Sequence, residues 1–145
     1  MIYTIAAFSP EHAMDIINRN GKALPIPEVQ LIQSYMIPGS QALTLLEDGV
    51  PIACGGIINQ DWRNGEAWLL NSIEFCQNLK MTWRVVREML PVLANKGNFK
   101  RVQAHSLEGK CSVIKHLRFQ YEGTKRRFSI DGQDATFWSR LFPEG

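Results

Sequence analysis

The chain has few cysteines, a small net charge and no long apolar run. Its three cysteines, Cys54, Cys76 and Cys111, are far apart in sequence and form no C-x-x-C pair. Scattered thiols of this kind argue against a disulfide framework and against a metal site, and they indicate a reducing cytosol. The net charge of +2 on 145 residues is too small to predict nucleic-acid binding by itself.

Membrane-spanning and targeting segments are also lacking. No window approaches the roughly 18 apolar residues that a membrane-spanning helix needs, so we expect no membrane partner. The first four residues, Met1 to Thr4, contain no basic segment and precede no long apolar run, so we expect no secretory signal. With 45% apolar residues, the chain is apolar enough to bury one core, and we predict a single domain over residues 1–145.

Apolar periodicity and turn signals predict a mixed α/β domain. The dipeptides Asp48-Gly49, Asn64-Gly65 and Asp131-Gly132 are typical of tight turns between strands. We expect Lys96-Gly97 to end the longest helix, with the glycine in the left-handed conformation. The order is β-α-α-β-β-β-α-β-α-β-β. Strands are predicted at 2–8, 41–47, 50–60, 66–72, 99–105, 119–130 and 135–141, and helices at 10–20, 29–35, 82–96 and 110–117.

The segment between residues 66 and 96 has the pattern of a strand that enters a long amphipathic helix. A turn of this kind directs the N–H groups of the first helical turn, and the positive end of the helix dipole, at one point, where a phosphate can bind. Yet the residues from Phe75 to Thr82 include no glycine, which the backbone usually needs to approach a pyrophosphate.

This order of elements resembles the GNAT superfamily of N-acetyltransferases over essentially the whole chain. Residues 48–56 look like the hairpin between the family's second and third strands, and residues 66–72 and 82–96 match its fourth strand and coenzyme helix. Residues 113–123 are similar to its last helix and the strand that follows. The resemblance implies a mixed central sheet of about six to seven strands flanked by about four helices. Within the superfamily, the small size looks most like the acetyltransferase-like proteins of short-tailed phages.

The resemblance implies acetyl-CoA as the cofactor, held by the turn and by backbone groups of the fourth strand. Two positions of the turn depart from the family pattern, since Lys80 and Thr82 stand where small residues surround the pyrophosphate. Lys80 could contact a phosphate, or its side chain could fill that space. Ile114 stands near a position that often holds a proton-donating tyrosine, and Arg118 replaces a glycine. The residues assigned to the coenzyme are Asn71, Ser72, Ile73, Gln77, Asn78, Leu79, Lys80, Met81 and Thr82.

Acetyl transfer to an amine needs a base that removes the ammonium proton. Glu66, at the start of the fourth predicted strand, is the best-placed carboxylate, and Glu74 is second; the alternative is that both are solvated charges at a strand end. His105 ends the fifth strand, where the acceptor could reach it, whereas His116 is expected on the surface. We identify no metal site.

Three functions remain open. The first is acetyl transfer from acetyl-CoA to an amine, either a small molecule or a protein. The second is a catalytically inactive protein of the same fold that contacts phage or host proteins, in the host cytoplasm or the virion. The third is a nucleic-acid-associated module, which the small net charge disfavours. It would use Lys125, Arg126 and Arg127 together with Lys96, Lys100 and Arg101. A homodimer through the final strand, with Phe137, Trp138 and Leu141, is also open.

Overall fold

The computed structural model describes residues 2–20, 37–61, 63–72, 75, 77, 79–107, 117–129 and 131–142. The predicted helix at 29–35 lies outside these ranges, and of the one predicted at 110–117 only Leu117 lies inside them. Ile114, which stands near the position of the family's tyrosine, also lies outside these ranges, as do Cys76, Cys111 and His116.

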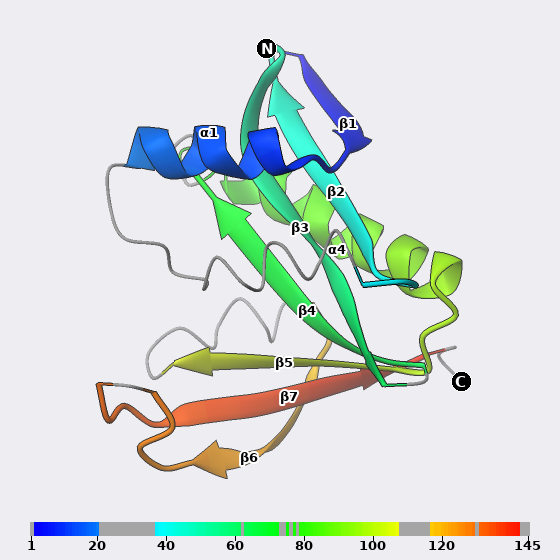
Figure 1. The fold of residues 1–145 in the computed structure, drawn as a ribbon, viewed down its shortest axis with the longest axis vertical. Helices are drawn as coiled ribbons and strands as arrows, with labels where there is room; N and C mark the ends of the chain where they lie inside the picture. The colour runs from blue at the N-terminus through cyan, green and yellow to red at the C-terminus, as the bar shows by residue number, and fades with distance from the viewer. Residues whose placement is uncertain are drawn as a thin grey trace.

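Seven strands form one mixed sheet in the order β1-β2-β3-β4-β5-β7-β6 (Figure 1). Neighbouring strands are antiparallel except β4 and β5, which run parallel. This confirms the predicted mixed sheet. The strands are β1 (Tyr3–Ala7), β2 (Gln41–Glu47), β3 (Val50–Asp61), β4 (Asn64–Asn71), β5 (Arg101–Leu107), β6 (Gln120–Lys125) and β7 (Ala135–Leu141), and the described helices are α1 (Pro10–Asn20) and α4 (Leu79–Lys96).

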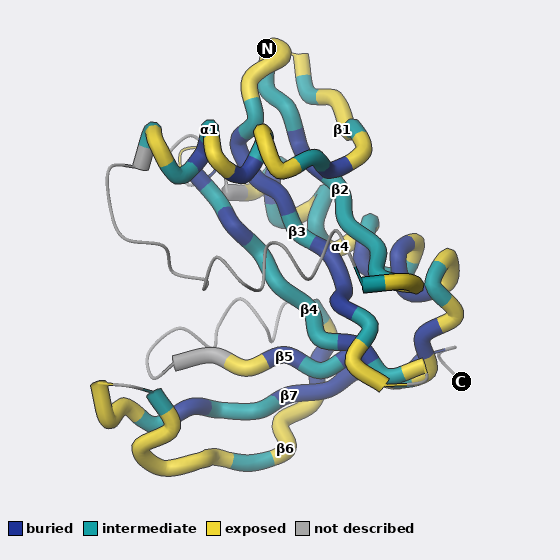
Figure 2. The backbone as a smooth tube through the Cα atoms, in the orientation of Figure 1, coloured by how far each residue is buried: buried dark blue, intermediate teal, exposed yellow. Residues whose placement is uncertain are grey.

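The two helices lie on opposite faces of the sheet (Figure 1). On the α4 face, Leu90, Leu93 and Ala94 pack with Val102 and Trp138 in the largest buried cluster. On the α1 face, a second buried cluster joins α1 to β3 and β4. Figure 2 shows burial concentrated in the central strands and exposure along β6. Within the described residues, no helix combines the length and the apolar character that crossing a membrane requires.

The first predicted hairpin turn is confirmed and the second is wrong. Asp48 and Gly49 connect β2 to β3 with φ values of 50° and 82°, the left-handed pair that a tight hairpin needs. Asn64 and Gly65, however, already belong to β4, and the left-handed residue before them is Arg63, with a φ of 65°. Position 65 requires a glycine because of packing and not because of a turn, since a Cβ there would overlap the side chains of Ile57 and Phe99.

The end of α4 also differs from the prediction. Asn98, and not Gly97, takes the left-handed conformation, with a φ of 56°. Its N–H donates to the Asn95 carbonyl at 3.2 Å, and the Phe99 N–H donates to the Ala94 carbonyl at 2.9 Å. These two bonds form a Schellman motif, and Phe99 then packs in the same cluster as Ala94. Phe99 therefore closes the helix, and the fifth strand starts at Arg101 instead of residue 99.

The final strand cannot pair with another copy through its backbone. β7 lies between β5 and β6, and each neighbour pairs with it in an antiparallel register. Trp138, on this strand, is buried in the core. Strand pairing through β7, which the sequence left open as a dimer contact, is therefore excluded, because the closing hairpin places β6 at the edge of the sheet and β7 inside it.

Candidate functional site

β4 and β5 separate from each other along their length. Their parallel pairing joins Asn64 to Arg101, Gly65 to Val102 and Glu66 to Gln103. Beyond Glu66, β4 continues to Asn71 and β5 to Leu107 without further pairs among these described residues. The two strands thus form a V that opens to the left in Figure 1, with Glu66 at its vertex. The structure contains the splayed edge on which the sequence-based hypothesis of coenzyme binding depends.

Every second residue of β4 directs its backbone N–H and C=O groups into this V. The Ser72 N–H donates to the Ile52 carbonyl of β3 at 2.8 Å, and the β3–β4 register runs without a shift from Ala53 to Asn59. Since the polar groups of an antiparallel strand alternate between its two edges, those of Ala67 and Leu69 point away from β3, toward β5. The N–H of Ser72 is taken, so a ligand in the V would meet the backbone of Ala67 and Leu69 instead.

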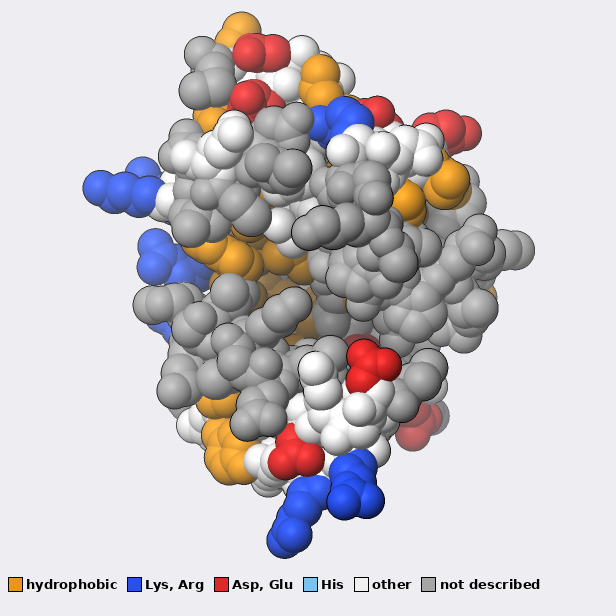
Figure 3. Space-filling view, turned by 90° about the vertical axis from the view of Figure 1, so that its left-hand side faces the viewer, with side chains coloured by type: hydrophobic (Ala, Val, Ile, Leu, Met, Phe, Trp, Pro, Cys, Tyr) orange, Lys and Arg blue, Asp and Glu red, His pale blue; other side chains and the backbone are white. Residues whose placement is uncertain are grey.

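Two buried polar atoms on β4 lack a partner. The Trp68 indole N–H and the Ser72 hydroxyl are buried, and neither finds a hydrogen-bond partner in the part of the chain that the structure describes. Both residues have the same parity on β4, so both side chains lie on the α1 face. Figure 3 looks into the open side of the V and shows a hollow lined by hydrophobic side chains. Unpaired buried polar atoms such as these are suited to a ligand that carries amide groups.

The first turn of α4 lies just beyond the end of β4. Thr82 is fully buried and its hydroxyl donates to the Phe75 carbonyl at 3.2 Å, so this side chain turns into the protein. Lys80 and Gln77 are exposed, and Met81 is half-buried. The backbone of Leu79 starts the helix. The other predicted coenzyme residues of this turn, Ile73 and Asn78, lie outside the described residues, as does Glu74.

At the vertex of the V, Glu66 belongs to a hydrogen-bonded chain of side chains. Its Oε1 lies 2.8 Å from Nδ1 of His105, and its Oε2 accepts a hydrogen bond from the Gln60 amide. Gln103 donates in turn to the Gln60 carbonyl at 2.9 Å. The Glu66 side chain is only 16% exposed and that of His105 33%. Glu66 is therefore a positioned carboxylate and not a freely solvated charge.

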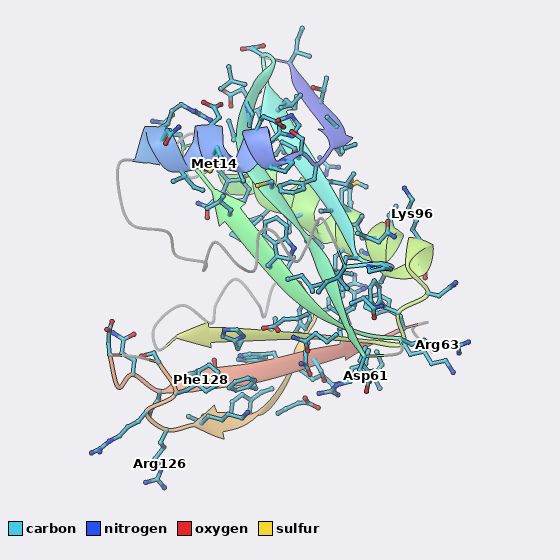
Figure 4. All side chains as sticks on the ribbon, viewed as in Figure 1. Met14, Asp61, Arg63, Lys96, Arg126 and Phe128 are labelled. Atoms are coloured by element: carbon cyan, nitrogen blue, oxygen red, sulfur yellow. The ribbon has the colours of Figure 1, made fainter. Side chains whose placement is uncertain are left out.

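Aromatic rings extend this site along β7. The His105 ring stacks on Phe137 with centroids 5.6 Å apart, and Phe128 meets both rings edge-on. Lys125 places its Nζ 4.5 Å from the centre of the Phe137 ring. Phe128, labelled in Figure 4, lies beside β7 in the lower arm of the V. His105, Phe137, Phe128 and Lys125 thus lie beside Glu66, on the face of the sheet opposite α4.

The remaining sequence candidates do not gather at this site. Burial raises the pKa of the Cys54 thiol to about 12, so Cys54 stays protonated and is a poor nucleophile. The predicted basic patch is divided, because Arg101 pairs with Glu122 and Figure 4 shows Lys96 and Arg126 far apart on the molecule. Arg118 has a φ of 64°, a left-handed conformation that favours glycine.

Solved structures share the overall fold of this chain. The archaeal Ard1 protein of Thermoplasma volcanium superposes with a TM-score of 0.80 at 12% identity, covering 99% of this chain and 100% of that one. The chain has the GNAT acetyltransferase fold. The Escherichia coli ribosomal-protein-S18-alanine N-acetyltransferase matches at a TM-score of 0.75 and 14% identity, covering 99% of this chain and 96% of that one.

The Salmonella typhimurium protein yncA, solved with its cofactor acetyl-CoA, also shares the GNAT fold. It matches at a TM-score of 0.77 and 14% identity, over 100% of this chain and 96% of that one. No family model matches the sequence, and no curated protein matches it in a sequence comparison. At these identities the likeness concerns the fold, and the chemistry must be argued from the residues of this chain.

Sequence reasoning named Glu66 as the base and mentioned His105, but it did not join them. The two residues lie on neighbouring strands and pair only because β4 and β5 run parallel at the vertex. The aromatic neighbours were missed as part of the site. The available signal was the alternation of residues 103 and 105 with the buried Val102 and Ala104, which places His105 on the opposite face from the core.

Proposed function

We propose that this protein is an N-acetyltransferase that moves the acetyl group of acetyl-CoA directly to an amine. The observation that carries the proposal is the Glu66–His105 pair at the vertex of the β4–β5 splay. A carboxylate and an imidazole in contact can take up a proton there, and the open V beside them offers the backbone edge of β4 to an extended ligand.

The residues beside the V fit the coenzyme. The backbone of Ala67 and Leu69 would pair with the amides of its pantetheine arm, near the unpartnered Trp68 and Ser72 groups. The N-terminal turn of α4 would meet its phosphates, with the exposed Lys80 as a point charge. Because Thr82 turns inward, its larger side chain does not fill the space in front of the helix. Acetyl-CoA, when bound, would supply an activated acetyl thioester.

Glu66 and His105 would share the proton transfer. Because Oε2 of Glu66 already accepts from Gln60, Oε1 can accept from Nδ1–H of His105. That bond selects the tautomer whose Nε2 carries a lone pair. Nε2 would then remove a proton from the ammonium of the acceptor, and the carboxylate would stabilise the imidazolium that forms. The freed amine attacks the acetyl carbonyl, and the products are the acetylated amine and coenzyme A.

Coenzyme binding is tested by thermal unfolding with saturating acetyl-CoA. At a ligand concentration of 100 times Kd, stabilisation is roughly 2.7 kcal/mol, which for a domain of this size raises Tm by roughly 5–10 °C. Lys80→Gln should reduce the shift. The matched control is Lys96→Gln, at the opposite end of the same helix, which should leave the shift unchanged. An unaltered Tm would refute the proposal and favour the non-catalytic, contact-making role.

A further inference from the structure

The ring cluster beside His105 has a chemistry that proton transfer does not use. We propose that Phe128 and Phe137 bind a second cationic group of the acceptor, so that the acceptor is a diamine or a longer cationic amine. The inference rests on the proposed function because it places the reacting nitrogen at His105. It adds the class of acceptor and the residues that select it.

The two phenylalanine rings form a corner that is open on one side. Their centroids lie 5.2 Å apart and their planes cross at 88°. His105 is 5.6 Å from each of them, so the three rings pack against one another next to the proposed base. Phe128 is 46% exposed, and this corner is therefore accessible from solvent.

The corner already holds an ammonium group. Nζ of Lys125 lies 4.5 Å from the centroid of Phe137 and 5.6 Å from that of Phe128. Both distances are within the range of a cation–π interaction, because the ring faces carry negative potential. Lys125 belongs to the exposed edge strand β6, and its flexible side chain can move into water at little cost. Lys125 thus acts as the resident cation, which a ligand ammonium can replace.

The surrounding charges favour a cation over an anion. The carboxylate of Glu66 contacts His105 on the side away from Phe137. With Lys125 displaced, the groups left at its position are the faces of Phe137 and Phe128, and the Glu66 carboxylate lies on the far side of His105. An acceptor would reach from His105 to Phe137, whose centroids are 5.6 Å apart, and a short alkyl chain between two nitrogens spans such a separation.

The loop that carries Phe128 is held in place by its own hydrogen bonds. The Arg127 N–H donates to the Asp134 carboxylate at 3.0 Å, and the Ser129 N–H donates to the Gln133 carbonyl at 3.1 Å. The Gln133 N–H donates to the Ser129 hydroxyl at 2.9 Å. Phe128 lies between these anchors, so its ring is positioned before a ligand arrives, which lowers the entropic cost of binding.

The test is an NMR titration without acetyl-CoA, following the ring protons of Phe128 and Phe137. The probes are 1,5-diaminopentane, pentylamine and 6-aminohexanoate, which have similar chains and differ in the terminal group. The wild-type protein should bind the diamine roughly fivefold more tightly than pentylamine, the size of one exposed cation–π contact. Lys125→Gln should strengthen diamine binding further, since it removes the competing ammonium.

Phe137→Leu and the more exposed Phe128→Leu should each remove the preference for the diamine. The control is Tyr121→Leu, an exposed ring on β6 that packs on Trp138 at the opposite face, and it should change nothing. Equal binding of diamine and monoamine by both the wild type and Lys125→Gln would overturn the inference. So would a preference for 6-aminohexanoate that Lys125→Gln abolishes, because Lys125 would then be an anion-binding residue. Since no coenzyme is present, this failure is distinguishable from failure to bind acetyl-CoA.

Discussion

Replacing Glu66 by glutamine should reduce catalysis far more than stability. The carboxylate accepts from the Gln60 amide and lies 2.8 Å from Nδ1 of His105. Glutamine is nearly isosteric, but it has one oxygen and one NH2 group. It can therefore accept from only one of these partners and must turn a donor toward the other. The variant loses both the negative charge and the control of the His105 tautomer.

The magnitudes follow from the position of Glu66 at the rim of the site. A mispaired polar group costs about 1–3 kcal/mol when it is buried, and with 16% of this side chain exposed we expect about 1 kcal/mol. For this chain length that lowers Tm by roughly 2–4 °C. Glu66 orients the base His105, so its loss should lower kcat by up to the roughly 10²–10⁴-fold that a positioned base supplies. The two effects are thus separable in one variant.

The assay is a double-mutant cycle with Glu66→Gln, His105→Gln and the double variant. Release of the coenzyme A thiol from acetyl-CoA is measured with the best acceptor in a panel of primary amines. Since the two residues act as one unit, the double variant should be no more than a few-fold slower than the slower single variant. Glu88→Gln is the control, because Glu88 is an exposed carboxylate paired with Arg84 on α4, and its kcat should equal that of the wild type.

Two outcomes would refute this reasoning. If Glu66→Gln kept the wild-type kcat, the carboxylate would have no part in proton transfer. If the double variant lost the product of the two single losses, Glu66 and His105 would act independently. Circular dichroism melts of all four proteins show whether a lost activity reflects unfolding instead.

Two further predictions concern the scaffold. Gly56→Ala should destabilise by roughly 1–3 kcal/mol, because its Cβ would overlap the Gln41 carbonyl and lie 2.7 Å from the Ala42 Cα. Thermal melts measure this loss, and a variant with the wild-type Tm would contradict the packing argument. The Arg101 hydrogen bond lowers the pKa of Glu122, so the bond stabilises the fold above the ordinary glutamate pKa and is lost as the pH falls through the lowered value. The Tm difference between wild type and Glu122→Gln should therefore shrink toward zero below about pH 4, and a constant difference would argue against the ion pair.

Most of the fold could be predicted because its signals are local. The strands 41–47 and 135–141 have the predicted limits, since alternation and flanking turn residues mark both ends. The errors arose at glycines, because a glycine can be required either for its backbone conformation or for its small size. Gly65 and Gly97 were interpreted as conformational requirements, whereas both are small because the ring of Phe99 packs against them. Contacts between residues distant in sequence leave no mark in a local pattern.

The sequence by itself determined the order of the strands, the mixed sheet and the choice of Glu66 as a candidate, because periodicity and turn chemistry act over a few residues. Only the tertiary structure decided that β4 and β5 part after Glu66, that this carboxylate meets His105, and that Lys125 rests on Phe137. Strand pairing is a long-range choice, set by how whole faces of the sheet bury against α1 and α4. The candidate site is therefore a product of packing, assembled from residues that carry no common motif.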